Sequence, residues 1–155
     1  MNSNNLAKLI IDQEPYIKQA IATGGAWEIW MQVALTLHLI NKGGFQASRE
    51  VPYLNNRSLK LDILLHDKLG NKCAIELKVE SATNAGEKVI SNIKKDVTKI
   101  AKYTQKGLVE RWVVGITYSA KAASDCARYA QANQRTTTFK TGKNIAVLIV
   151  SVPLK

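Results

Sequence analysis

Two short segments carry charged side chains at alternate positions, as residues that share one face of a β-strand do. In the segment LKLDILLH, this alternation places Lys60 and Asp62 on one face. In the segment CAIELKVE, it places Glu76 and Lys78 on one face and apolar residues on the other. If the two strands form a hairpin centred on Leu69, Asp62 lies directly opposite Glu76, with Cβ atoms roughly 5 Å apart.

Two carboxylates that face each other in an apolar sheet repel each other and lose their hydration, so another group must compensate. A divalent cation such as Mg²⁺ would do so, because it prefers carboxylate, water and phosphate oxygens. It would polarise a phosphodiester and lower the pKa of a bound water. The Lys78 ammonium could orient or deprotonate that water, or stabilise developing negative charge. The same residues could instead form a cross-strand salt-bridge cluster on a solvated face, and both interpretations stay open.

The elements that must position these side chains follow from apolar periodicity and from the glycines and prolines. Helices are predicted over about 5–22 with an interruption at Pro15, over Trp27–Asn41, over about Gly86–Lys106 and over Ala120–Asn133. Strands are predicted over roughly Phe45–Tyr53, Leu59–His66, Lys72–Glu80, Arg111–Thr117 and Ile145–Val152. This order predicts one α/β (α+β) domain over residues 1–155, with a mixed β-sheet flanked by helices.

The spacing of the charged residues resembles a known motif. Asp62, thirteen intervening residues and then Glu76-Leu77-Lys78 resemble the D…(D/E)-x-K signature of the PD-(D/E)xK nuclease superfamily, which has a restriction-endonuclease-like fold. Leu61 stands where the motif's name has proline. The superfamily's core order is αβββαβ, with the motif on the second and third strands. Residues from about 25 to 117 match that order, with an extra N-terminal helix before them and a C-terminal αβ extension after them.

The resemblance implies both an activity and roles for individual residues. The implied activity is endonuclease hydrolysis of phosphodiester bonds that depends on Mg²⁺, for which Mn²⁺ can substitute. Asp62, Glu76 and the carbonyl of Leu77 would hold the metal, and Lys78 would act on the nucleophile. The superfamily's core helix often supplies another acid, which here is Glu28. A buried carboxylate without a partner is costly, so we expect a metal or a lysine beside Glu28.

Lysines recur along the helix predicted after the third strand. At 100° per residue, five of them fall within an arc of about 60°: Lys88, Lys95, Lys99, Lys102 and Lys106. The arc contains no acid, which favours contact with a phosphate backbone through Lys95, Lys99 and Lys102. A charged stripe opposite an apolar one is also typical of any surface helix.

Two other polar residues have open roles. Gln32 lies one turn after Glu28 and is predicted either to contact the metal's water or the substrate, or to form a hydrogen bond in the core. Glu50 would either join the acidic cluster or pair with Arg49 or Arg57.

The overall charge favours a polyanionic partner. The sequence has 22 Lys and Arg against 12 Asp and Glu, a formal net charge of +10, and Lys and Arg contacts with phosphates dominate non-specific nucleic-acid affinity. An anionic membrane surface, or no specific partner, would also be compatible with this charge. Cys73 and Cys126 lie too far apart in sequence for a zinc-finger pair. With no Sec-type leader and no bilayer-spanning segment, we expect a cytoplasmic protein without a membrane partner.

The sequence leaves several functions open, and DNA cleavage is the preferred one. The second is cleavage of RNA, in particular tRNA, by a toxin domain of a bacterial competition system that a cognate immunity protein would neutralise. The third is a structure-selective resolvase-type enzyme, normally a homodimer. A non-catalytic nucleic-acid-binding domain, with the acids in structural ion pairs, is the alternative from a different class.

Overall fold

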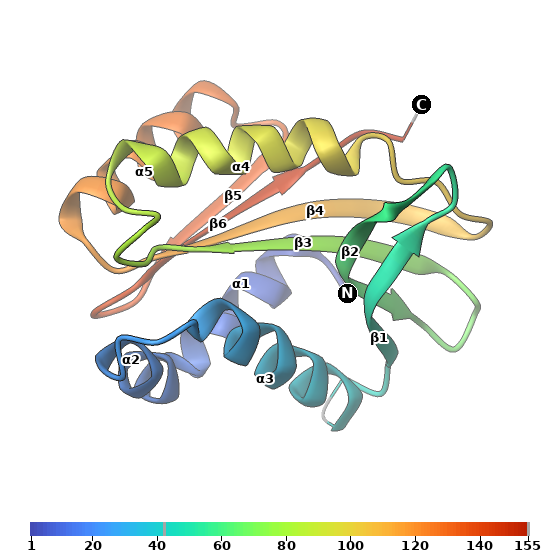
Figure 1. The fold of residues 1–155 in the computed structure, drawn as a ribbon, viewed down its shortest axis with the longest axis horizontal. Helices are drawn as coiled ribbons and strands as arrows, with labels where there is room; N and C mark the ends of the chain where they lie inside the picture. The colour runs from blue at the N-terminus through green and yellow to red at the C-terminus, as the bar shows by residue number, and fades with distance from the viewer. Residues whose placement is uncertain (42, 155) are drawn as a thin grey trace.

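The computed structural model describes residues 1–41 and 43–154 of the 155-residue chain (Figure 1). The helices are α1 (Ser3–Asp12), α2 (Glu14–Ala22), α3 (Trp27–Asn41), α4 (Glu87–Ile100) and α5 (Ala120–Ala132). The strands are β1 (Gln46–Tyr53), β2 (Asn56–His66), β3 (Lys72–Val79), β4 (Leu108–Thr117), β5 (Thr137–Thr141) and β6 (Ala146–Ser151). No helix among these residues is long and apolar enough to cross a membrane.

The strands form one mixed sheet in the order β1-β2-β3-β4-β6-β5. Strands β3 and β4 are parallel, and every other neighbouring pair is antiparallel. Helices α1, α2 and α3 cover one face of the sheet, while α4 and α5 cover the other (Figure 1). The predicted mixed sheet flanked by helices is therefore confirmed.

Each face of the sheet has its own apolar core, and β4 contributes to both. Trp112 and Val114 pack with α1 to α3, whereas Val113 packs with α4 and α5. A strand covered on both faces reads as a continuous apolar run, as the segment WVVGI does. Helix α4 approaches β4 closely because Gly115 has no Cβ, which would otherwise collide with the side chain of Ile93.

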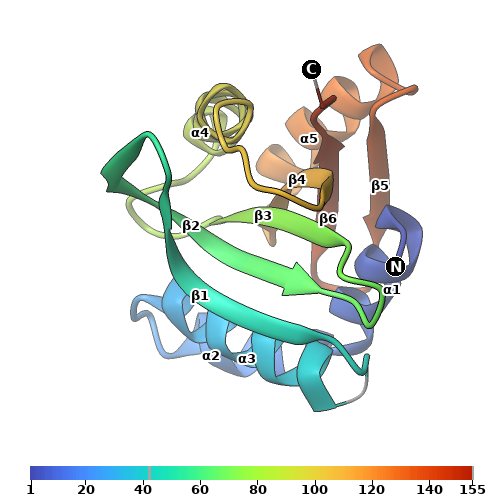
Figure 2. The same cartoon turned by 90° about the vertical axis from the view of Figure 1, so that its right-hand side faces the viewer.

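Strands β2 and β3 pair in the predicted register. The pairs Ile63–Ile75, Leu64–Ala74 and Leu65–Cys73 are symmetric about Leu69. The ladder stops at Ile63 and Ile75, so Asp62 and Glu76 do not form the direct cross-strand pair that this register predicts. The rest of β2 leaves β3 with β1 as its partner. The β1–β2 hairpin curls toward α4 at this point (Figure 2).

The hairpin bends at Glu50, which has a positive φ of 55° in the left-handed region. Before the bend, Ala47 packs with the core beneath α3. After it, Val51 and Tyr53 belong to the core beneath α4, although all three residues have the same parity. Because Glu50 adopts the left-handed conformation, side chains of the same parity lie on one face of the sheet before it and on the other face after it.

Strands β2 and β4 begin at Asn56 and Leu108, a few residues before their predicted starts, and one helix end and one strand differ more. The helix predicted to reach Lys106 ends at Ile100, so Lys102 and Lys106 lie beyond it. The chain leaves the helix because the Tyr103 side chain turns into the core, where it is 1% exposed and packs edge-on against Tyr53. Strand β5, which the sequence did not predict, pairs with β6.

Candidate active site

The predicted charged residues meet at the fork where β2 leaves β3. Leu77 lies just beyond the last β2–β3 pair, so its backbone N–H has no partner in the ladder. The Asp62 carboxylate takes that position, and its Oδ2 accepts the Leu77 N–H at 2.7 Å. A strand residue directs its N–H and C=O to the same side, so the Leu77 carbonyl also faces the fork. The bend of the hairpin therefore places Asp62 beside the backbone of the motif.

Glu76 is 2% exposed, and both of its carboxylate oxygens are engaged. The Tyr53 hydroxyl donates to Oε1 at 3.0 Å, and the Lys99 ammonium donates to Oε2 at 2.8 Å. Lys99 also donates to the backbone carbonyl of Lys60 at 2.9 Å. Glu76 thus links helix α4, through Lys99, to the β1–β2 hairpin, through Tyr53.

Lys78 is held between two carboxylates from opposite faces of the sheet. Its Nζ lies 3.3 Å from Glu28 Oε1 on α3 and 3.8 Å from Asp96 Oδ2 on α4. Glu28 Oε2 also accepts the backbone N–H of Val79 at 3.2 Å, which fixes the start of α3 against β3. Glu28 therefore has a lysine partner, one of the two kinds of partner that were expected for it, although its side chain is 32% exposed and not buried.

The site contains four carboxylates and two ammonium groups: Glu28, Asp62, Glu76, Asp96, Lys78 and Lys99. Burial raises the pKa of Glu76 to about 7, and repulsion by Asp62 adds to the effect. Burial likewise raises the pKa of Asp62 and of Asp96. With all six groups ionised, the cluster would carry a formal charge of −2, which a divalent cation would neutralise.

The pKa of Lys78 responds to opposing influences. Burial acts to lower it, but the neighbouring carboxylates of Glu28 and Asp96 outweigh burial, so the pKa is raised. Lys78 consequently stays protonated at neutral pH. This favours a role in charge stabilisation or water orientation over a role as general base.

The oxygen donors around Asp62 and Glu76 suit a metal ion that keeps most of its waters, and not one that needs a full set of protein ligands. Within residues 1–41 and 43–154, no group of three or more His, Cys, Asp or Glu side chains is placed to hold a metal ion. The structure therefore offers no all-protein cage. Mg²⁺ does not require one, because it usually keeps several waters and takes one or two carboxylates. Asp62, Glu76 and the Leu77 carbonyl meet that requirement if Lys99 releases Glu76 Oε2.

The other predicted residues are spread around this cluster. Gln32 is 5% exposed, and its amide oxygen accepts a hydrogen bond from Arg49 at 2.8 Å, the core role that the sequence left open. Lys95 is exposed and contacts Asn92 at 3.3 Å. Lys102 is exposed just after α4. Of the lysines predicted to bind nucleic acid, only Lys99 contacts a residue of the motif in the described structure.

Glu50 does not join the acidic cluster. It is exposed and lies 3.6 Å from Lys60, instead of pairing with Arg49 or Arg57.

Sequence reasoning missed Asp96 and Tyr53. On a helical projection, Asp96 falls at the border between the lysine stripe and the apolar stripe of α4. An acid that close to the core-facing positions of a helix indicates a partly buried carboxylate that needs a partner, and this can be read from the sequence. Tyr53 had no such signal, because only the bend at Glu50 brings its hydroxyl to Glu76.

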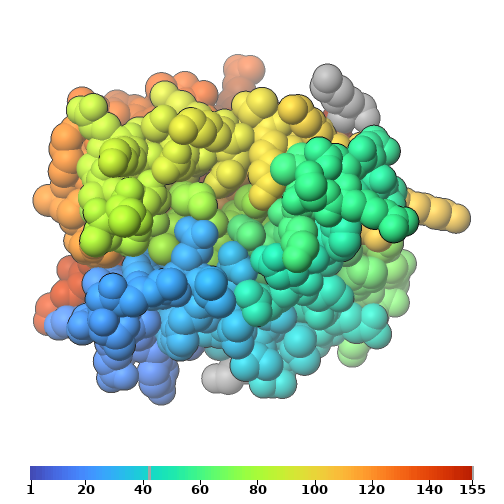
Figure 3. All heavy atoms as spheres, viewed as in Figure 1, coloured from blue at the N-terminus to red at the C-terminus, as the bar shows by residue number. Residues whose placement is uncertain are grey.

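A cavity of about 380 Å³ opens beside Lys78. It is lined by Ala26, Trp27, Glu28, Lys78, Val79, Ser81, Thr83, Asn84 and Asn92. The Asn84 amide donates to the carbonyl of Val79 at 2.7 Å, so the loop after β3 is tied to the wall of the site. The surface is hollowed between α4 and the N-terminal half of α3 (Figure 3). A ligand could therefore reach Lys78 from solvent.

Comparisons of the chain with protein-family models, with curated proteins and with solved structures found no match.

Proposed function

We propose that the chain is a nuclease that uses Mg²⁺ to hydrolyse phosphodiester bonds in DNA. The observation that carries the proposal is the meeting of Asp62, Glu76 and Lys78 at the fork between β2 and β3. The element order from α3 to β4 is αβββαβ, with the motif on the second and third strands. That order supports a restriction-endonuclease-like core.

Asp62, Glu76 and the Leu77 carbonyl would hold the metal. When bound there, Mg²⁺ would polarise the scissile phosphate and lower the pKa of a coordinated water. Mn²⁺, which also prefers oxygen ligands, would substitute. The Leu77 N–H keeps Asp62 oriented toward the fork, and the Tyr53 hydroxyl keeps Glu76 in place.

Lys78 would act on the attacking water and on the charge that develops at phosphorus. Glu28 and Asp96 keep its ammonium protonated and hold it on the open side of the motif. A protonated lysine in that position orients the lone pairs of a water and stabilises the negative phosphoryl oxygens. Glu28 and Asp96 are positioning residues in this scheme, and Lys78 is a catalytic residue.

Lys99 would exchange partners when substrate binds. Its ammonium bonds to Glu76, yet its side chain is 28% exposed and so can reach a phosphate at the surface. Lys95 and Lys102, both exposed, would contact phosphates farther along the strand. Their lack of carboxylate partners in the described structure supports this assignment.

The formal charge of +10 supports a nucleic-acid substrate. This positive charge favours DNA and RNA alike, and we propose DNA as the substrate. Cleavage of tRNA in place of plasmid would identify RNA as the substrate. In that case, an immunity protein with an acidic surface would be the expected partner.

The test is incubation of the purified protein with supercoiled plasmid and, separately, with total tRNA, each with Mg²⁺ and with EDTA. We expect plasmid nicking that requires Mg²⁺ and that falls at least about 100-fold in Lys78→Ala, since loss of one positioned charge at a transition state costs this order of rate. Glu76→Gln should be equally impaired.

Glu110→Gln is the matched control, because Glu110 is an exposed acid on β4 outside the cluster. It should cleave as the native protein does. Metal-independent cleavage, or full activity in Glu76→Gln, would refute the proposal. Cleavage of tRNA alone would retain the chemistry and replace the substrate.

A further inference from the structure

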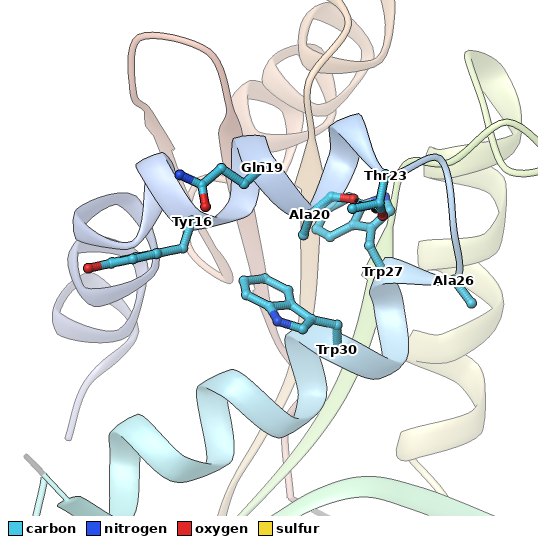
Figure 4. A pocket seen from close by; sticks show the side chains of 7 residues that line it. All are labelled: Tyr16, Gln19, Ala20, Thr23, Ala26, Trp27 and Trp30. Atoms are coloured by element: carbon cyan, nitrogen blue, oxygen red, sulfur yellow. Dashed lines mark hydrogen bonds between the residues drawn. The ribbon is translucent and has the colours of Figure 1, made fainter.

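A second cavity, of about 430 Å³, lies between α2 and α3 (Figure 4). It is lined by Tyr16, Gln19, Ala20, Thr23, Ala26, Trp27 and Trp30. Tyr16 and Gln19 border it from α2, and the Trp30 ring borders it from α3 (Figure 4). None of these seven residues carries a charge.

Two of the three aromatic side chains that line this cavity are exposed to solvent. Tyr16 is 59% exposed and Trp30 is 38% exposed, whereas Trp27 and Trp112 are almost fully buried. The exposed parts of these rings offer flat faces for stacking. The Gln19 amide makes no hydrogen bond to other described residues, so it can bond to a polar edge. The cavity thus combines ring faces with a donor and an acceptor.

The cavity adjoins the candidate active site. Ala26 and Trp27 line both this cavity and the one that contains Glu28 and Lys78. The Trp27 indole N–H donates to the carbonyl of Glu80 at 2.8 Å, so the shared wall is fixed to the residue that follows β3. The start of α3 thus forms a wall that the two cavities share.

The two neighbouring cavities suit the two halves of a nucleotide. The cavity at Lys78 is lined by the Lys78 ammonium, which is paired with Glu28, and by hydroxyl and amide side chains, and both kinds of donor can bond to a phosphate. The cavity between α2 and α3 is neutral and aromatic, which suits a base, because every base has a π-face that stacks on aromatic side chains.

We propose that the Tyr16–Trp30 cavity binds an unpaired nucleobase next to the cleaved phosphodiester, an inference that rests on the proposed nuclease function. Bases inside a duplex are stacked on one another and cannot enter such a cavity without leaving the helix. The protein therefore prefers single-stranded or locally opened nucleic acid at this position. The substrate class narrows to strands with at least one unpaired base beside the scissile bond.

The test measures binding without turnover. Fluorescence anisotropy of a labelled single-stranded DNA oligonucleotide, and of a blunt duplex of the same sequence, is recorded with Glu76→Gln protein in EDTA. Adding Trp30→Ala or Tyr16→Ala should weaken single-strand binding roughly tenfold, the order for loss of one stacked base, and should leave duplex binding unchanged. The single strand should also quench tryptophan fluorescence in the Trp30-containing protein alone.

Leu37→Ala is the matched control, because Leu37 is 53% exposed on the same helix but outside the cavity. It should bind both DNAs as the parent does. Tyr16 lies on the other helix at the surface, so its replacement tests the cavity even if Trp30→Ala unfolds. Circular dichroism establishes folding in each case.

Three outcomes would overturn the inference. The first is unchanged single-strand affinity in both aromatic variants. The second is an equal loss in Leu37→Ala. The third is a native dimer, seen by sedimentation, that Trp30→Ala dissociates, because the cavity would then be an interface between two copies. The nuclease proposal is judged separately by cleavage in Glu76→Gln, so either proposal can fail while the other stands.

Discussion

Glu76 is buried with its charge beside Asp62, and this arrangement sets a pH dependence of stability. Its pKa of about 7 in the folded protein lies above the ordinary 4.5. A carboxyl with a raised pKa contributes stability that is fully present below 4.5 and is lost as pH rises through 7. In EDTA, Glu76→Gln should therefore be more stable than the native protein at pH 8, by up to about 3 kcal/mol. Thermal or urea unfolding across this pH range measures the difference.

The advantage of Glu76→Gln should shrink toward zero as the pH approaches 4.5, because the native carboxyl is then neutral as well. Glu110→Gln, an exposed acid-to-amide change outside the cluster, is the matched control. A native protein whose stability relative to Glu76→Gln does not change between pH 5 and pH 8 would contradict the assignment.

Lys99 occupies an oxygen of Glu76 that a metal would need, so its ammonium competes with a divalent cation. Lys99→Gln removes that positive charge from the edge of the site. We expect Mn²⁺ to bind roughly tenfold more tightly to this variant, because like charges a few ångströms apart repel strongly at a partly buried site. Calorimetric titration with Mn²⁺ measures the affinity without any substrate.

Lys95→Gln is the matched control, since it removes a lysine one helical turn away that contacts Asn92 and no acid of the cluster. Its Mn²⁺ affinity should remain close to the native value. Weaker binding of Mn²⁺ to Lys99→Gln would show that Lys99 supports the metal site instead of competing with it.

At the scale of elements, alternation and apolar runs were enough to predict most of the architecture. The β2–β3 register follows from the turn centred on Leu69, and this symmetry is local enough to appear in the sequence. The bend at Glu50 does not appear there, because Ala47, Val51 and Tyr53 keep the same parity in the sequence although the face on which they are buried changes. The end of α4 was missed for a similar reason, since Tyr103 leaves the helix to meet Tyr53 on a distant strand.

Helix α2 is fastened to the β5–β6 turn by one carboxylate. Glu14 is 9% exposed and accepts hydrogen bonds from the backbone N–H groups of Lys143 and Asn144 and from the Asn144 side chain. Burial acts to raise the pKa of Glu14, but these donors outweigh it, and the pKa is lowered. Glu14 therefore stabilises the fold above pH 4.5 and loses that contribution as pH falls.

Glu14→Ala should lower the free energy of unfolding at pH 7 by about 2–3 kcal/mol, because it leaves partly buried N–H donors without an acceptor. Urea unfolding measures this loss. The exposed Asp12→Ala, just before α2, should cost far less. Equal stability of Glu14→Ala and the native protein would mean that the turn is held by its other contacts.

At the scale of the whole molecule, the charge of +10 predicts how binding responds to salt. Affinity for duplex DNA should fall linearly with the logarithm of salt concentration, because each lysine–phosphate contact releases counterions. Lys102→Gln should reduce the slope by about 0.9, the value for one lost contact on a duplex. Lys8→Gln, on α1 across the sheet from α4, should leave the slope unchanged. An unchanged slope in Lys102→Gln would remove Lys102 from the binding surface.

The bend at Glu50 also disfavours pairing between the exposed sheet edges of two molecules. Strand β1 is an edge of the sheet, and a long flat edge would offer its free backbone groups to the edge of another molecule. The left-handed residue twists that edge midway, and Pro52 removes an N–H two residues later. The opposite edge, β5, has only five residues and carries Lys140. The distortion that opens the fork for Asp62 therefore also protects the protein from edge-to-edge aggregation.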